Sequence, residues 1–139
     1  HVLLIQRKYY PAKDAWALPG GHVQDDENAE QASLRELSEE TKIDVSKSVL
    51  RQVMYANRVF DAPYRSTRRR TITNAFAYFI EPMVKNGKVI LPKVKATDDA
   101  KRAEWFPISK VLNEMRSTLM EDHAQIIEWA LSQQGIKNV

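Results

Sequence analysis

Residues 20–43 read GGHVQDDENAEQASLRELSEETKI, and this stretch decides the fold. Its Gly-Gly pair favours a turn, and the Ala, Leu, Glu and Gln residues that follow are strong helix formers. We therefore predict a helix from about Glu27 to Thr41. Asp25 and Asp26 precede it and are expected to cap its N-terminus, where acidic side chains are favourable.

Three glutamates of this helix share one face. Glu36, Glu39 and Glu40 have the spacing i, i+3, i+4, which places them within an arc of about 100°. Their charges repel one another, and hard divalent cations such as Mg²⁺ or Mn²⁺, which prefer oxygen ligands, would offset that cost. A bare E-x-x-E-E spacing is more often a solvated acidic face, so the surrounding pattern has to decide between the two interpretations.

The surrounding pattern resembles the Nudix box, G-x5-E-x7-R-E-U-x-E-E-x-G-U, where U is an aliphatic residue. Residues 21–43 match every fixed position except one, because Lys42 stands where the box has glycine. That glycine would end the helix in a left-handed conformation, in which a lysine costs about 1 kcal/mol. The segments WALPGG and AEWFPI are also similar to Nudix sequences, so the resemblance covers nearly the whole chain.

The resemblance implies a role for each matched residue. Glu36, Glu39 and Glu40, together with the Gly20 carbonyl, are expected to ligate Mg²⁺ or Mn²⁺. Arg35 and Glu27 are expected to form an ion pair that holds the loop and the helix in shape. The general base that takes the proton of the attacking water stays open between several carboxylates, namely Glu36, Glu40, Asp98, Asp99 and Glu121. Asp98 and Asp99 are equally expected to be plain turn residues.

Segments outside the box narrow the expected substrate. HVLLIQRK, WALPGG, VFDAPYRSTRRRTITNAF and MEDHAQII resemble the Nudix half of bifunctional nicotinamide mononucleotide adenylyltransferase/ADP-ribose pyrophosphatases, which splits ADP-ribose into AMP and ribose 5-phosphate. We therefore expect metal-dependent hydrolysis of the diphosphate bond of a nucleoside diphosphate derivative, with ADP-ribose first. The alternative is a non-catalytic, ADP-ribose-sensing transcriptional regulator of Nudix type, although the acidic positions that such regulators usually lose are intact here.

Substrate contacts are predicted from residues that suit phosphate, base or ribose. Loop 61–70 contains four arginines, whose guanidinium groups can bind phosphates bidentately, although a solvated basic loop is the alternative. Phe60 could stack on adenine or pack in the core, and His123 could contact ribose or cap the last helix. The predicted substrate-binding set is Arg7, Arg58, Arg70, Phe60, Glu121 and His123.

The order of predicted elements is β, β, α, β, β, β, β, α, α. This order favours an α/β fold, in Nudix terms an α/β/α sandwich with a mixed β-sheet between helices. The expected strands are Val2–Arg7, Trp16–Leu18, Val49–Phe60, Thr71–Ile80, a hairpin around Asn86-Gly87, and Ala103–Phe106. The expected later helices run from a Ser109 cap to about Met115 and from Glu121 to Gln133.

The 139 residues suit one domain, 1–139, and their composition excludes several classes of site. The chain has no cysteine, which excludes disulfides, zinc–thiolate sites and a cysteine nucleophile, and agrees with a cytoplasmic location. The net charge of +3 suits an anionic nucleotide, and we expect no nucleic-acid or membrane partner. A homodimer is compatible with the family. Because the chain opens inside a strand, we expect a first strand and a fused adenylyltransferase domain to lie outside these residues.

Overall fold

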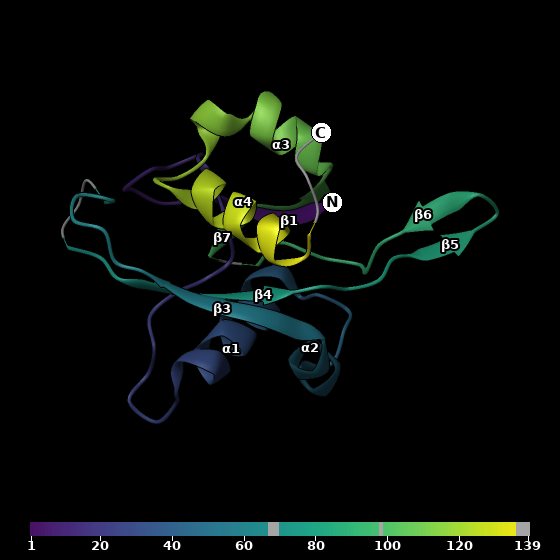
Figure 1. Ribbon diagram of the computed structural model, residues 1–139, viewed down its shortest axis with the longest axis horizontal. Helices are drawn as coiled ribbons and strands as arrows, with labels where there is room; N and C mark the ends of the chain where they lie inside the picture. The colour runs from purple at the N-terminus through teal and green to yellow at the C-terminus, as the bar shows by residue number, and fades with distance from the viewer. Residues whose placement is uncertain (67–69, 98, 136–139) are drawn as a thin grey trace.

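The structure is a computed structural model that describes residues 1–66, 70–97 and 99–135. Its elements are β1 (Val2–Arg7), β2 (Trp16–Ala17), α1 (Ala29–Thr41), α2 (Lys47–Val53), β3 (Met54–Phe60), β4 (Thr73–Tyr78), β5 (Met83–Lys85), β6 (Lys88–Ile90), β7 (Ala100–Phe106), α3 (Ile108–Asn113), the 3-10 turn η1 (Arg116–Thr118) and α4 (His123–Gln133). Helices α1 and α2 lie on one side of the strands, and α3 and α4 lie on the other (Figure 1). The predicted α/β sandwich is therefore confirmed.

The strands pair differently from the single mixed sheet that we predicted. Strand β1 pairs with β2 and β7, β3 pairs with β4, and β5 pairs with β6, and each of these ladders is antiparallel. Within the described residues, parallel pairing is limited to an isolated bridge between Trp16 and Leu119. Strands β1 and β2, β3 and β4, and β5 and β6 are consecutive in the chain, and antiparallel pairing of consecutive strands needs no crossover connection.

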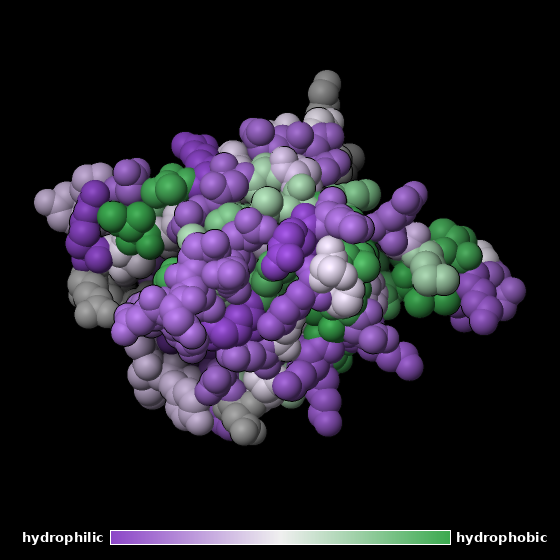
Figure 2. Space-filling view, turned by 90° about the horizontal axis from the view of Figure 1, so that it is seen from below, coloured by the Kyte–Doolittle hydropathy of each residue, from purple (hydrophilic) through white to green (hydrophobic). Residues whose placement is uncertain are grey.

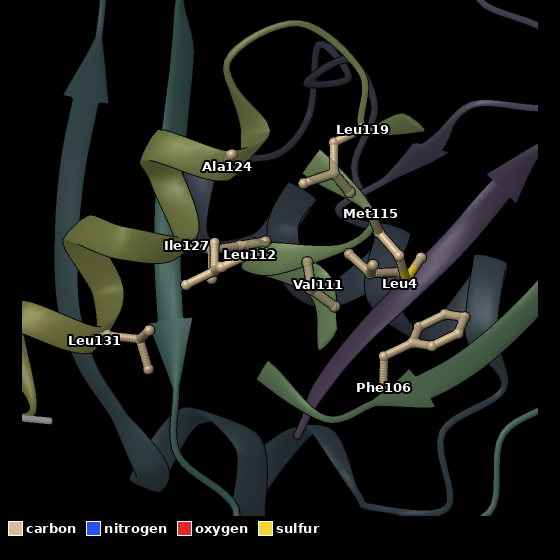
Figure 3. Packing of buried hydrophobic residues seen from close by; sticks show 9 residues of the cluster. All are labelled: Leu4, Phe106, Val111, Leu112, Met115, Leu119, Ala124, Ile127 and Leu131. Carbon is tan, nitrogen blue, oxygen red and sulfur yellow. The ribbon is translucent and has the colours of Figure 1, made fainter. Parts of the chain in front are cut away.

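The core lies on both faces of β1, because successive side chains of a strand point to opposite sides. Leu4 packs against the α3 and α4 layer, in a cluster that includes Phe106, Val111 and Ile127 (Figure 3). Leu3 packs on the opposite side, in a cluster formed with Leu34, Ile43 and Leu50 from the α1 and α2 layer. The central strand thus holds the two helical layers together.

The predicted strand Val49–Phe60 is wrong over its first part, because residues 47–53 form helix α2. The β-branched and apolar residues of this stretch favoured a strand. However, the Ser46 side chain accepts a hydrogen bond from Val49 N and caps the helix, and Leu50 is fully buried. Local capping and burial of one leucine therefore outweigh β propensity here.

Two predicted helix caps are also wrong. Helix α1 is capped by Asn28, which forms a capping box with Gln31, while Asp25 and Asp26 lie exposed in the preceding loop. Helix α3 begins after Pro107 without a side-chain cap, so Ser109 does not start it. Pro107 precedes the first turn of α3, where a proline is tolerated because an N–H there would have no partner within the helix.

Asn86 and Gly87 form the predicted hairpin turn, and both residues have positive φ (53° and 74°). The hairpin of β5 and β6 projects away from the body (Figure 1). The surface seen from below is mainly hydrophilic, with apolar side chains gathered on this hairpin (Figure 2). Among the described residues, no helix has the length and apolarity needed to cross a membrane.

Candidate active site

The three predicted metal-binding glutamates of α1 lie in three different environments. Glu40 is buried, with 8% of its surface exposed. The side chain of Glu36 is 17% exposed and that of Glu39 is 56% exposed. The helical face that the three glutamates share is therefore buried at Glu40 and exposed to solvent at Glu39.

A Pro-Gly-Gly turn provides that cover. Gly20 N donates a hydrogen bond to Glu40 Oε1 at 2.7 Å. A Cβ atom on Gly21 would overlap the Glu36 carboxyl group, so the absence of a side chain at Gly21 allows this carboxylate to lie against the turn. The turn and the helix together bring Glu36 and Glu40 to one place in the fold.

Arg35 ties the loop before α1 to the helix. Its Nη2 lies 2.7 Å from Glu27 Oε1 and donates to the His22 carbonyl at 3.0 Å. Its Nη1 donates to Glu36 Oε1 at 2.9 Å and to Glu39 Oε2 at 3.1 Å. The hydrogen bond from Arg35 lowers the pKa of Glu27, and the same bond raises the pKa of Arg35. The ion pair that the resemblance implied is therefore present.

Negative charge concentrates around Glu40. The pKa of Glu40 is raised to about 7, chiefly by burial and also by the charges of Glu36 and Asp99, while the hydrogen bond from the Gly20 N–H lowers it. The positive charge of Arg7 lowers this pKa as well. A carboxylate that is this costly to ionise, and that has other carboxylates for neighbours, would gain most from a bound cation.

The donor set fits a hard divalent cation. Carboxylate oxygens of Glu36 and Glu40 are the ligands that Mg²⁺ and Mn²⁺ prefer. Within the described part of the chain, no three acidic or imidazole side chains already form a closed cage, since Glu39 turns toward Arg35. An ion held by Glu36 and Glu40 would thus keep open positions, as Mg²⁺ usually does for water and phosphate oxygens.

Comparison with known proteins identifies the family. The family model for the NUDIX domain matches residues 1–130. The chain belongs to the Nudix family. An ADP-ribose pyrophosphatase from Methanocaldococcus jannaschii is 35% identical over 127 residues, a match that covers 91% of this chain and 63% of that protein.

Solved structures agree with the Nudix assignment. A bifunctional NMN adenylyltransferase/ADP ribose pyrophosphatase from Francisella tularensis, complexed with AMP and Mn ion, has a TM-score of 0.87 and 38% identity; the match covers 96% of this chain and 38% of that one. The NUDIX domain of Shewanella oneidensis NrtR, complexed with ADP ribose, has a TM-score of 0.69 and 25% identity, with 95% and 76% covered. The chain thus spans less than two thirds of the length of the Methanocaldococcus and Francisella proteins.

Lys42 departs from the Nudix box in sequence but not in backbone conformation. It ends α1 with φ 48° and ψ 35°, in the left-handed region, and its N–H donates to the Ser38 carbonyl at 3.0 Å. The conformation expected of the box glycine is therefore kept by a lysine. Lys42 therefore ends the helix at the cost of local strain.

The predicted substrate-binding residues Arg7, Arg58, Phe60 and Arg70 lie in different environments. Arg7, at the end of β1, donates from Nε to the Pro11 carbonyl at 2.9 Å and is close enough to influence Glu40. Arg58 is exposed and lies over the Phe60 ring, with 4.9 Å from Cζ to the ring centroid. Phe60 in turn meets Trp129 edge to face, with ring centroids 5.6 Å apart. Arg70 is exposed. Arg68, Arg69 and Asp98 lie outside the described residues.

The motif Glu121-Asp122-His123 has a structural role that the sequence did not reveal. Asp122 binds the buried Arg65 through two hydrogen bonds, at 2.7 and 2.9 Å, so Arg65 is held by a carboxylate rather than lying in a solvated basic loop. Ser66 Oγ donates to Glu121 Oε1 at 3.3 Å. His123 Nδ1 accepts from Leu18 N at 3.0 Å, and therefore neither caps α4 nor offers that nitrogen to ribose.

Proposed function

We propose that this Nudix domain hydrolyses the diphosphate bond of a nucleoside diphosphate derivative. We propose ADP-ribose as its preferred substrate, with AMP and ribose 5-phosphate as products. The main support is that the Pro-Gly-Gly turn lies against Glu36 and Glu40, in a chain similar to an ADP-ribose pyrophosphatase and to a structure holding AMP and Mn ion.

The proposed metal ligands are Glu36, Glu39, Glu40 and the Gly20 carbonyl. When bound there, Mg²⁺ or Mn²⁺ supplies charge neutralisation for the phosphates and lowers the pKa of a water ligand. Arg35 and Glu27 would keep loop 22–27 fixed on α1, so that the glutamates present the same geometry to each substrate molecule.

Hydrolysis requires a proton acceptor, and two carboxylates of the site are candidates. Water attacks one phosphorus, the bridging P–O bond breaks, and the proton of the water passes to a carboxylate. Glu40 is one candidate, and a cation bound beside it would lower its pKa below the value of about 7 that burial gives it in the metal-free protein. Asp99 lies close enough to interact with Glu40 and would take the role if Glu40 is occupied as a ligand. Comparing the pH profiles of Glu40→Gln and Asp99→Asn separates the two.

The rest of the substrate is proposed to extend from Glu40 toward the residues around Arg7. A cavity of about 460 Å³ is lined by residues 11–15 and 117–121 and by Arg65. Pro11, in its lining, accepts a hydrogen bond from Arg7, which connects the cavity with the neighbourhood of Glu40. Arg7 and Arg70 would bind phosphates, Arg58 and Phe60 would offer a flat face to adenine, and Glu121 would contact ribose.

The experiment that tests this function is a hydrolysis screen with ADP-ribose and a panel of other nucleoside diphosphate derivatives, in Mg²⁺ or Mn²⁺, with identification of the products. AMP from ADP-ribose is the expected result. Glu40→Gln should reduce turnover by orders of magnitude, whereas Glu30→Gln, on the same helix and 3.6 Å from Arg51 Nε, should not. Absence of turnover on the entire panel would refute the proposal.

A regulatory function is the second candidate, favoured by the likeness to NrtR complexed with ADP ribose. It predicts that ADP-ribose binds without being hydrolysed and changes the affinity of the full protein for DNA. The intact acidic positions at Glu36, Glu39 and Glu40 favour the hydrolase. Ligand-responsive DNA binding without AMP formation would favour the regulator.

A further inference from the structure

The chain segment before α4 continues the sheet edge next to the Pro-Gly-Gly turn. Trp16 and Leu119 form a parallel bridge, and Met120 N donates to the Trp16 carbonyl at 2.8 Å. In a parallel ladder, the Met120 carbonyl would accept the next hydrogen bond, from Leu18 N. Instead, the chain turns at Glu121, where φ is 48°, and the Met120 carbonyl accepts from His123 N at 3.1 Å.

The imidazole of His123 takes the place of that backbone acceptor. Leu18 N donates to His123 Nδ1 at 3.0 Å, across 105 residues of sequence. An accepting Nδ1 requires a neutral ring with its proton on Nε2. Burial lowers the pKa of His123 to about 4, with smaller effects from Asp122, Glu121, Arg65 and Arg7, so the ring is neutral near pH 7.

One residue of restricted backbone, Pro19, separates Leu18 from Gly20, which binds Glu40 at the proposed metal site. Pro19 follows Leu18, and its ring fixes φ, which removes one of the rotations that would let the turn move independently. Gly20 comes next, and its N–H holds Glu40 Oε1 at 2.7 Å. His123 and Glu40 therefore hold the two ends of one three-residue segment.

The start of α4 is itself held in place by side-chain contacts. We therefore expect His123 to keep its position and to resist a displacement of the Leu18-Pro19-Gly20 segment. Asp122 binds Arg65, whose side chain is 3% exposed and also donates to Thr73 Oγ1 at 2.8 Å. This places the imidazole on a fixed support tied to β4. A fixed acceptor on one side and a buried carboxylate on the other define the position of Gly20.

We infer that His123 is a positioning residue for the metal site, because its acceptor nitrogen holds the Leu18-Pro19-Gly20 segment against Glu40. This inference rests on the proposed metal-dependent function. Groups that orient metal ligands from outside typically change metal affinity by about 10–100-fold when they are removed. Because His123 acts through two intervening residues, we expect a loss near the lower end, roughly tenfold.

The test measures Mn²⁺ affinity of the full chain without substrate, by following free Mn²⁺ with electron paramagnetic resonance. His123→Leu removes the acceptor, while His123→Asn places Oδ1 where Nδ1 stands and should restore binding. Gln125→Leu, an exposed change on the same helix, is the matched control. We expect His123→Leu to bind roughly tenfold more weakly, and the other two to bind as wild type does. Circular dichroism melting curves check that each variant is folded.

Restoration by asparagine is the result that a merely structural role would not give. If His123→Leu does not fold, His123→Gln replaces it, because its longer side chain is also polar but shifts the acceptor away from the Nδ1 position. Equal Mn²⁺ affinity of wild type and the acceptor-removing variant would overturn the inference and leave the proposed function standing. A wild-type protein that binds no Mn²⁺ would overturn both.

Discussion

Glu40→Gln is expected to stabilise the metal-free protein at alkaline pH while it removes hydrolytic activity. Glu40 is buried, its pKa is raised to about 7 chiefly by that burial, and Glu36 and Asp99 oppose its charge. Ionising Glu40 therefore costs more free energy in the folded protein than in the unfolded chain. Glutamine keeps the size of the side chain and an oxygen for the Gly20 N–H, but carries no charge.

The size of the effect follows from the two pKa values. A pKa of about 7 in the folded protein, against 4.5 in the unfolded chain, corresponds to about 3 kcal/mol at most. Because the folded pKa is the higher one, this stability is fully present below about pH 4.5 and is lost as pH rises through about 7. The variant has no such loss, so its advantage over wild type should grow from near zero in acid to its full value in alkali.

The assay is urea unfolding of both proteins in a chelator, at about pH 5 and about pH 8.5. Other titrating groups are shared by the two proteins and cancel in the difference between their free energies of unfolding. Glu30→Gln serves as the control, since Glu30 is partly exposed and far weaker in its contacts. Adding Mn²⁺ at alkaline pH should stabilise wild type and not Glu40→Gln. An advantage of Glu40→Gln that is absent, or that does not depend on pH, would refute the reasoning.

Three further predictions concern the end of α1, the glycine turn and the Arg65–Asp122 ion pair. Lys42→Gly should raise the free energy of unfolding by about 1 kcal/mol in chemical denaturation, without changing turnover, because Lys42 ends α1 in the left-handed region. Gly21→Ala should displace the flexible Glu36 carboxyl and weaken Mn²⁺ binding in a titration while the melting temperature changes little; Gly20→Ala, whose Cβ would meet no atom within 4 Å, should have the smaller effect. Arg65→Met should lower the free energy of unfolding by about 3 kcal/mol, because it leaves Asp122 without its buried partner.

Local sequence patterns predicted the parts of the fold that depend on local physics. The carboxylate face of α1 follows from helical spacing, and the Asn86-Gly87 hairpin follows from the positive φ that its turn requires. Helix α2 was missed because Val49, Leu50 and Val53 favoured a strand, and the features that decide it are the cap at Ser46 and the burial of Leu50. Burial depends on the tertiary fold, which a short window of sequence does not contain.

Residues whose role depends on distant partners were the ones that sequence patterns could not separate. Four arginines in loop 61–70 are equivalent as sequence, and nothing in that sequence indicates that Arg65 pairs with Asp122, a residue 57 positions away. His123 is similar, since its partner is the backbone N–H of Leu18, and a backbone amide leaves no signature in the sequence. The type of a side chain indicates which interactions it can make, but the fold determines which partner it binds.

The same reasoning explains why the glutamates of one helical face are unequal. Arg35 shares its guanidinium with Glu36 and Glu39, and so offsets part of their charge. Among the described residues, Glu40 accepts a hydrogen bond from the Gly20 N–H and is influenced by the more distant charge of Arg7, while burial removes water from it. The electrostatic demand for a cation is therefore concentrated at Glu40, at the point where the glycine turn closes over the helix. In a site arranged in this way, the buried charge lowers the stability of the metal-free protein. A divalent ion, with the phosphates that it would bind, would offset that loss.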